Sequence, residues 1–205
     1  MRKDAFENLY QTYKQFLNTS ASLYCGNVKQ QVFHAKARKY VSSLECAVDA
    51  NNVSSSVYHN LIDTVNKNLD KMHQYVSLRK KCLGVEELHM YDIYTPMIAD
   101  VAKKISFEEA KETVLKALAP LGEDYVNKVK EGFENRWIDV YENQGKRSGA
   151  YSAGAYGCHP YVLLNYNGTL DDMFTLAHEM GHAMHSNYSN EAQPYIYAGY
   201  KIFVA

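Results

Sequence analysis

The pattern H-E-x-x-H, formed by His178, Glu179 and His182, constrains the fold of this chain more than any other feature. Residues four apart lie on one face of an α-helix, about 5–6 Å apart at Cβ, so both histidines can aim a ring nitrogen at one ion if this stretch is helical. Glu179 lies about 100° further round the helix, where its carboxylate can accept a proton from water beside that ion. The pattern predicts one Zn²⁺ ion with His178 and His182 as ligands and Glu179 as catalytic base.

The helix that carries this pattern is predicted to run from Thr169 to Asn187. Thr169 is the expected N-cap, with Asp172 three residues later as in a capping box, and Asp171 also favours the first turn. Gly181 leaves room between the two histidines for a neighbouring chain or a substrate. Apolar or small residues cover most of the circumference, which predicts a buried helix; they are Leu170, Met173, Phe174, Leu176, Ala177, Met180, Ala183 and Met184.

A catalytic zinc ion normally has three protein ligands, and only two are evident here. His185 lies on nearly the same face as His178. We expect it to contact the metal ligands rather than bind the ion itself, since three ligands on one straight helix cannot easily surround the ion. Glu191 is the only acidic residue after the pattern, and we expect it in a polar turn outside the helix. His185 and Glu191 are the two alternatives for a third ligand within this chain. The alternative to a metal site is a pair of core histidines satisfied by hydrogen bonds.

Helices are expected through the first two thirds of the chain. One long amphipathic helix is predicted from Ser55 to Leu83, with Gly84 as its left-handed cap. Two earlier helical stretches are expected to be separated by Gly26. The long helix should bury one apolar stripe, which consists of Val57, Leu61, Val65, Leu69, Met72 and Val76.

Two shorter helices should follow. The sequence SFEE at Ser106–Glu109 is a capping box that starts one of them, and this helix is expected to stop near Pro120. The next helix should carry a core stripe of aromatic and apolar residues at intervals of four. These residues are Tyr125, Val129, Phe133 and Trp137.

A Gly-, Ser- and Tyr-rich segment then predicts two short strands, SGAYSAGAY and PYVLLNY, joined near 157–160. The first strand has little side-chain bulk, so another backbone can approach it closely. Gly149, Ala150 and Tyr151 are therefore candidate substrate-binding residues, which would hold a peptide by edge pairing. The alternative is a tightly packed turn against neighbouring helices.

Composition excludes several classes of function. The net charge of -1 provides no field for nucleic acid or an anionic membrane, and no apolar run has the roughly 18 residues of a membrane span. The N-terminus has no uninterrupted apolar core, so it is not a secretory signal, and we expect a soluble, cytoplasmic protein. The four cysteines are scattered and are expected to be reduced.

Long stretches of the chain resemble the oligoendopeptidase F group of the thimet-oligopeptidase-like zinc metallopeptidases. They are GKRSGAYSAGAYGCHPYVLLNYNGTLDDMFTLAHEMGHAMHS, QPYIYAGYKIFVA, NVKQQVFHAKARKYVSSLECAVDANNV and ELHMYDIYTPM. The resemblance implies a mostly helical peptidase with a deep channel that admits short peptides. It also implies His178 and His182 as zinc ligands, Glu179 as base, and a third ligand that is a glutamate on a following helix.

That glutamate follows F-V-A in the family, whereas here Ala205 is the last residue. The resemblance thus implies a central fragment whose partners are the N- and C-terminal parts of the same polypeptide. We expect a mainly α, zincin-like fold in which residues 1–205 form an incomplete catalytic domain, with a helical lead-in at 1–105 and the hairpin and zinc helix at 106–205. With two ligands, the chain alone should bind zinc weakly and cleave poorly.

The expected function is zinc-dependent hydrolysis of oligopeptides inside the chain, that is, endopeptidase activity. Two alternatives stay open. One is a non-catalytic helical module that binds peptides or a partner protein in the same cleft. The other is a zincin-type metallohydrolase that acts on a different amide.

Overall fold

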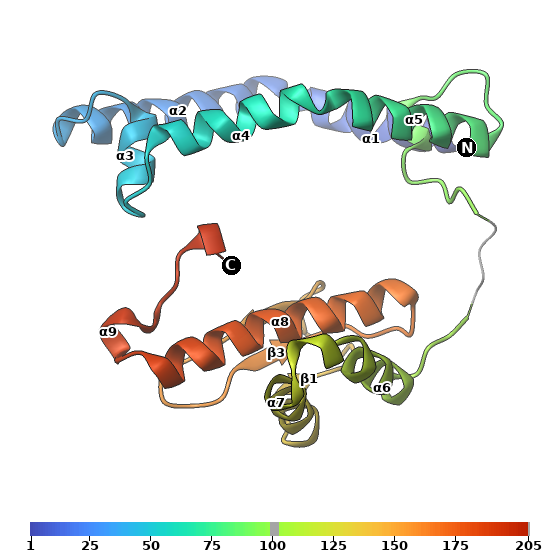
Figure 1. Cartoon of the computed structure of the whole chain (residues 1–205). Helices are drawn as coiled ribbons and strands as arrows, with labels where there is room; N and C mark the ends of the chain where they lie inside the picture. The colour runs from blue at the N-terminus through green and yellow to red at the C-terminus, as the bar shows by residue number, and fades with distance from the viewer. Residues whose placement is uncertain (99–102, 205) are drawn as a thin grey trace. The chain divides into compact units, whose positions relative to one another are not determined.

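The computed structural model describes residues 1–98 and 103–204, which form two compact units, Met1–Asp100 and Val101–Ala205. The mainly helical fold that the sequence predicts is confirmed (Figure 1). Among the described residues, no helix combines the length and the apolar character that a membrane span requires.

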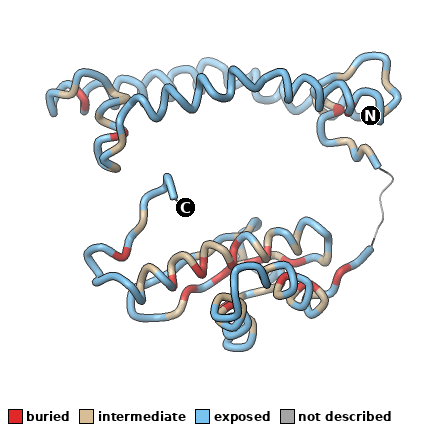
Figure 2. Tube along the Cα trace, viewed as in Figure 1, coloured by how far each residue is buried: buried red, intermediate tan, exposed pale blue. Residues whose placement is uncertain are grey.

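The first unit consists of helices that bury very few side chains, as Figure 2 shows. They are α1 (Arg2–Gln15), α2 (Leu17–Ala37), α3 (Ser43–Asp49), α4 (Ser55–Lys67) and α5 (Leu69–Leu83), followed by the short 3₁₀-helix η1 (Met90–Asp92). Buried polar contacts fasten α5 to the η1 segment, because the guanidinium of Arg79 donates hydrogen bonds to the carbonyls of Asp92 and Thr95. Arg2 from α1 forms an ion pair with the buried carboxylate of Asp92 at 3.0 Å.

The predicted boundaries in this unit were partly wrong. Gly26 lies inside α2, and the break falls at Phe16 instead. The predicted long helix from Ser55 to Leu83 is divided at Asn68. Gly84 does end α5 in the left-handed conformation, with φ of 62°, and its N–H bonds the carbonyl of Lys81.

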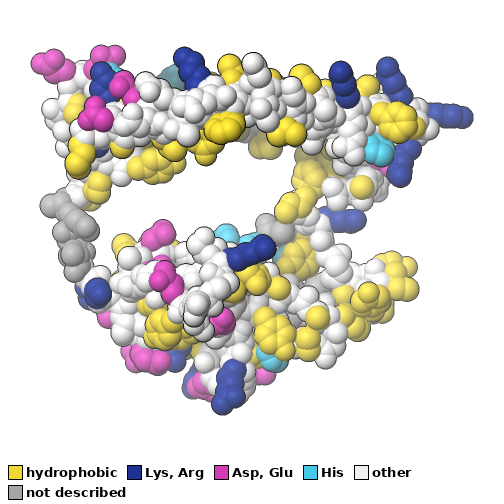
Figure 3. Space-filling model, turned by 180° about the vertical axis from the view of Figure 1, so that it is seen from behind, with side chains coloured by type: hydrophobic (Ala, Val, Ile, Leu, Met, Phe, Trp, Pro, Cys, Tyr) yellow, Lys and Arg dark blue, Asp and Glu magenta, His cyan; other side chains and the backbone are white. Residues whose placement is uncertain are grey.

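The apolar stripe of α4 and α5 was predicted to be buried, and this was wrong for the described chain. Its six side chains are 39% to 63% exposed. Hydrophobic side chains are also exposed on α1 and α2, the helices that face the viewer in Figure 3. Helical periodicity therefore identifies the apolar face correctly, but within the described residues nothing covers it.

The second unit contains a three-stranded sheet with the strand order β1-β3-β2. Its elements are α6 (Phe107–Ala117), η2 (Ala119–Leu121), α7 (Glu123–Glu134), β1 (Ile138–Asp139), β2 (Tyr151–Ala153), β3 (Tyr161–Leu163), α8 (Leu170–Ala192), α9 (Tyr195–Ala198) and η3 (Ile202–Val204). The predicted hairpin is confirmed, because β2 pairs antiparallel with β3 and Ser152 lies opposite Val162. Strand β1, which pairs parallel with β3, was not predicted.

One hydrophobic core joins α6, α7 and α8 to the sheet (Figure 2). Its fully buried members include Val129 of α7 and four residues of α8, which are Leu176, Met180, Ala183 and Met184. Trp137 was predicted to lie on the stripe of α7, but the helix ends at Glu134 and the buried indole is in the core just before β1. Ser106 caps α6 as predicted, whereas the carboxylate of Glu109 contacts Lys103 instead of closing the capping box.

Candidate metal centre

Helix α8 begins where the sequence predicts and carries the H-E-x-x-H pattern in its middle. The hydroxyl of Thr169 accepts a hydrogen bond from the N–H of Asp172 at 3.1 Å, and the carboxylate of Asp172 accepts one from the N–H of Thr169 at 2.8 Å. This reciprocal capping box fixes the start of the helix and hence the direction of every side chain after it.

The apolar residues bury only one face of α8, so the prediction of a buried helix is correct for that face alone. Leu170 and Phe174 are exposed, and so is His178. The four fully buried residues hold one side of the helix against the core. The face with the two histidines therefore remains open within the second unit, and a Cβ placed on Gly181 meets no atom within 4 Å.

The structure brings His178 and His182 into direct contact. Their Nε2 atoms are 3.0 Å apart, and the two rings are nearly perpendicular at 87°. Two nitrogens that bind one zinc ion at about 2.0–2.1 Å with tetrahedral angles are about 3.3 Å apart. The observed separation is about 0.3 Å shorter than this value, so the pair fits a zinc ion after a small movement of the two rings.

Glu179 lies beside this pair and is only 8% exposed. Its position follows from the helix, which turns about 100° per residue and so directs Glu179 to one side of the line between the two histidines. A carboxylate can act as a general base toward a water molecule that lies within hydrogen-bond reach.

His185 and Glu191, the two alternative ligands, make other contacts. The ring of His185 stacks on Tyr200, with centroids 3.6 Å apart and planes 9° from parallel. Glu191 was predicted to lie outside the helix, and this was wrong because α8 continues to Ala192. Its carboxylate accepts a hydrogen bond from Asn187 and lies 3.5 Å from Lys128.

Lys128 forms ion pairs with Glu131 and with Glu191, which lies near the end of α8. A hydrogen bond to Glu131, together with the negative charges of Glu131 and Glu191, raises the pKa of Lys128.

Within 1–98 and 103–204, no group of three or more His, Cys, Asp or Glu side chains is placed to hold one ion. Ala205, which ends the stretch that resembles the peptidase family, lies outside the described residues.

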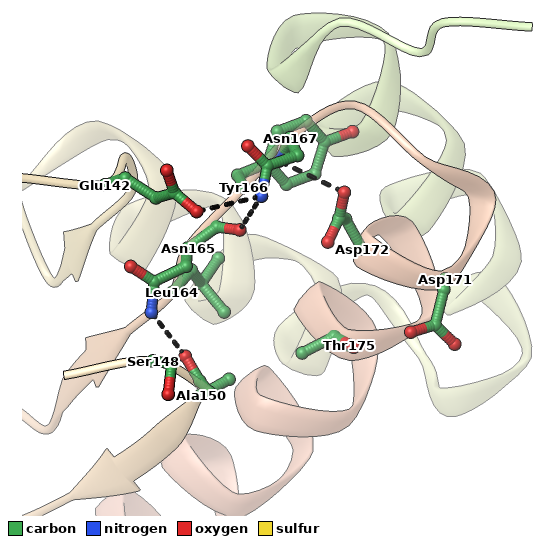
Figure 4. A pocket seen from close by; sticks show the side chains of 11 residues that line it. Glu142, Ser148, Ala150, Leu164, Asn165, Tyr166, Asn167, Asp171, Asp172 and Thr175 are labelled. Carbon is green, nitrogen blue, oxygen red and sulfur yellow. Dashed lines mark hydrogen bonds between the residues drawn. The ribbon is translucent and has the colours of Figure 1, made fainter. Parts of the chain in front are cut away.

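The predicted substrate-binding residues lie at the start of β2. Gly149 and Ala150 line a cavity of about 340 Å³ between this strand and the first turns of α8 (Figure 4). Tyr151 is exposed at the first position of β2 and does not line this cavity. Strand β2 is one of the two outer strands of the sheet, and it is three residues long.

The sequence did not reveal the role of Asn165, which holds in place the segment that leads into β2. Its amide nitrogen donates to the carbonyls of Arg147 and Gly149 at 2.9 and 2.7 Å. Asn167 similarly donates to the carboxylate of Glu142 at 3.3 Å (Figure 4). The only signal in the sequence was the change from a buried strand to polar residues after Leu164, which does not reveal the distant partners.

Comparison with known proteins gives consistent similarities. The profile of Peptidase family M3 matches residues 1–205. Oligopeptidase PepF of Bacillus subtilis is 51% identical over 205 residues, which are 100% of this chain and 31% of that protein. Oligoendopeptidase F (chromosomal) of Lactococcus lactis subsp. cremoris is 46% identical over 205 residues, which are 100% of this chain and 34% of that protein.

The chain is also similar to solved structures of oligoendopeptidases. The crystal structure of oligoendopeptidase-F from Enterococcus faecium is 36% identical, with a TM-score of 0.62 over 93% of this chain and 28% of that chain. The chain spans about a third of the length of the curated relatives that it matches.

Proposed function

Because the chain belongs to peptidase family M3, we propose that it carries the catalytic centre of a zinc-dependent endopeptidase that hydrolyses short peptides. The observation that carries this proposal is the contact between the Nε2 atoms of His178 and His182, 3.0 Å apart, with the sheltered Glu179 beside them. The names of the relatives, oligopeptidase and oligoendopeptidase, support peptides as the substrate class.

His178 and His182 would hold the zinc ion, and the resemblance to the family implies a glutamate as the third ligand. When bound, zinc supplies Lewis acidity toward a peptide carbonyl and toward water. Glu179 takes a proton from the attacking water and passes it to the leaving amine, which restores the carboxylate for the next turnover. Both units would belong to one catalytic domain. The location of the protein in the cytoplasm is a separate prediction.

Strand β2 would hold the substrate. Since β2 is an outer strand, the edge that does not pair with β3 offers backbone N–H and C=O groups with which an extended peptide can pair. The small residues Gly149 and Ala150 let the peptide backbone come close at one end of this edge. Pairing with backbone groups also allows many different peptide sequences to bind.

The substitution Glu179→Gln tests the role of the base in the complete polypeptide that the gene encodes. We expect peptide cleavage to fall about 10²- to 10⁴-fold, because the amide cannot accept the proton, while the zinc content stays the same. Glu191→Gln, on the same helix, is the matched control and should retain cleavage. A Glu179→Gln enzyme that keeps its zinc and cleaves peptides at the parental rate would rule out this assignment.

The rival function is a peptide-binding module without catalysis. It is favoured by one observation, namely that the described residues bring together two metal-binding side chains and not three. A peptidase assay with and without a chelator discriminates the two functions, since only an enzyme loses turnover when zinc is removed.

A further inference from the structure

A second cavity lies at the other end of β2. It has a volume of about 220 Å³ and belongs entirely to the second unit. Gly154 follows the end of β2, and Ser186 contributes from α8, one turn after His182. The full lining consists of Gly154, Tyr156, Ser186, Asn190, Tyr195, Ala198, Gly199 and Tyr200.

Two of the three tyrosines in this lining already use their hydroxyl groups. The hydroxyl of Tyr200 lies 2.8 Å from the Oγ of Ser186, and that of Tyr156 donates to the carbonyl of Gln193 at 3.1 Å. The ring of Tyr156 also meets that of Tyr195 edge to face, with centroids 5.6 Å apart. The hydrogen bonds hold the rings of Tyr156 and Tyr200 in place, and the ring of Tyr195 packs against that of Tyr156.

The lining is also electrically neutral, since none of these eight residues carries a charge. The cavity at the start of β2 is different, because Glu142, Asp171 and Asp172 line it. A volume below the roughly 300–1,000 Å³ of small-molecule sites matches one side chain rather than a whole ligand. Three tyrosine rings in a neutral lining favour an aromatic or large apolar side chain.

We propose that this cavity receives an aromatic or large apolar side chain of the peptide substrate, and so determines where the peptide is cut. The inference rests on the proposed function, because it requires a peptide that lies along β2. Ser186 is about 6 Å along the helix axis from His182 and about 9 Å from the middle of the histidine pair. An extended peptide advances about 3.3 Å per residue, so the bound side chain belongs about two or three residues from the cleaved bond.

The test uses the complete polypeptide and a set of alanine-rich peptides in which one phenylalanine is moved through every position. We expect cleavage at a fixed offset of about two or three residues from the phenylalanine, on one side of the cut. At that position, kcat/KM for phenylalanine should exceed that for alanine by about three- to tenfold, the range of a favourable aromatic pair.

Tyr195→Ala should bring this ratio close to one, and Tyr195→Phe should keep it, because the ring and not the hydroxyl forms the wall. Tyr197→Ala is the matched control. Tyr197 lies on the same short helix α9 and is 72% exposed, against 73% for Tyr195, but it does not line the cavity. The Tyr197→Ala enzyme should keep the ratio of the parent.

Two results would overturn the inference: cleavage without a fixed offset from the phenylalanine, or a ratio that Tyr195→Ala and Tyr197→Ala leave equally unchanged. Failure of the proposed function is a separate result. It would show as cleavage that survives Glu179→Gln or zinc removal, whatever the position of the phenylalanine.

Discussion

At the residue scale, two glycines inside helices of the second unit have opposite surroundings. A Cβ on Gly132 of α7 would lie 2.8 Å from Cε3 of Trp137 and 3.0 Å from Cε of Met180. A Cβ on Gly181 of α8 would meet no atom within 4 Å. Gly132 is therefore required by close packing. Gly181 costs conformational entropy on folding, as any helical glycine does, and close packing does not require it.

Alanine at these positions should change stability in opposite directions. Gly132→Ala should lower the free energy of unfolding by about 1–3 kcal/mol, because the rigid indole must move. Gly181→Ala should raise it by about 0.5–1 kcal/mol. Denaturant titration followed by fluorescence measures both, since Trp137 is the only tryptophan and is buried in this unit. Equal shifts in the two variants would contradict the packing argument.

The histidine pair was predictable from sequence, because a spacing of four residues on a helix fixes the direction of both rings. The contact of His185 with Tyr200 was not predictable. It joins residues that are far apart in the chain, and it depends on how α9 folds back beside α8. Local periodicity contains no information about such a return.

At the scale of elements, one buried tyrosine connects the segment after β3 to the start of α6. The hydroxyl of Tyr166 donates a hydrogen bond to the carbonyl of Ile105 at 3.0 Å. The N–H of Ile105 in turn donates to the carbonyl of Gly168 at 2.9 Å. These bonds hold the beginnings of α6 and α8 together, so they stabilise the start of the helix that carries the H-E-x-x-H pattern.

Burial raises the pKa of the Tyr166 hydroxyl, with a smaller contribution from the charge of Asp172. The folded chain therefore keeps this proton at pH values where the unfolded chain has lost it, and stability must fall as pH rises above about 10. Tyr166→Phe should flatten this fall, because the variant cannot ionise there. Thermal unfolding measured between pH 8 and pH 11 checks it; identical pH profiles for both proteins would contradict the assignment.

The sequence predicted α8 well and the helix breaks of the first unit badly. A capping box is a local signal, and Thr169 with Asp172 was sufficient to locate the start of α8. Gly26 lowers helix propensity by only about 1 kcal/mol, which its neighbours in α2 overcome. The break at Asn68 has a physical cause, because its side chain donates to the carbonyl of Thr64. Nothing in the sequence explains the break at Phe16.

At the scale of the whole molecule, the first unit exposes an apolar stripe along α4 and α5. Exposed apolar surface of this extent normally marks an interface. The sequence pattern reveals which face of a helix is apolar but not what covers it, and for this reason a correct periodicity led to a wrong expectation of burial.

The 205-residue chain alone should therefore associate with itself as its concentration rises. Leu61→Glu, in the middle of the stripe, should shift the equilibrium toward the monomer, because a buried carboxylate opposes contact between apolar faces. Asn66→Glu adds the same charge to an exposed polar position of α4 and should have little effect. Sedimentation equilibrium measures the mass of each; a mass that does not depend on concentration would contradict the prediction.

The short length of β2 has a consequence for the kind of molecule that can use its free edge. Long, flat outer strands act as templates on which further chains add as strands, and such growth leads to fibres. Three residues offer enough hydrogen-bonding groups to align a flexible peptide briefly, but too few to start a growing stack. An exposed edge of this length therefore does not serve as a template for the addition of further strands.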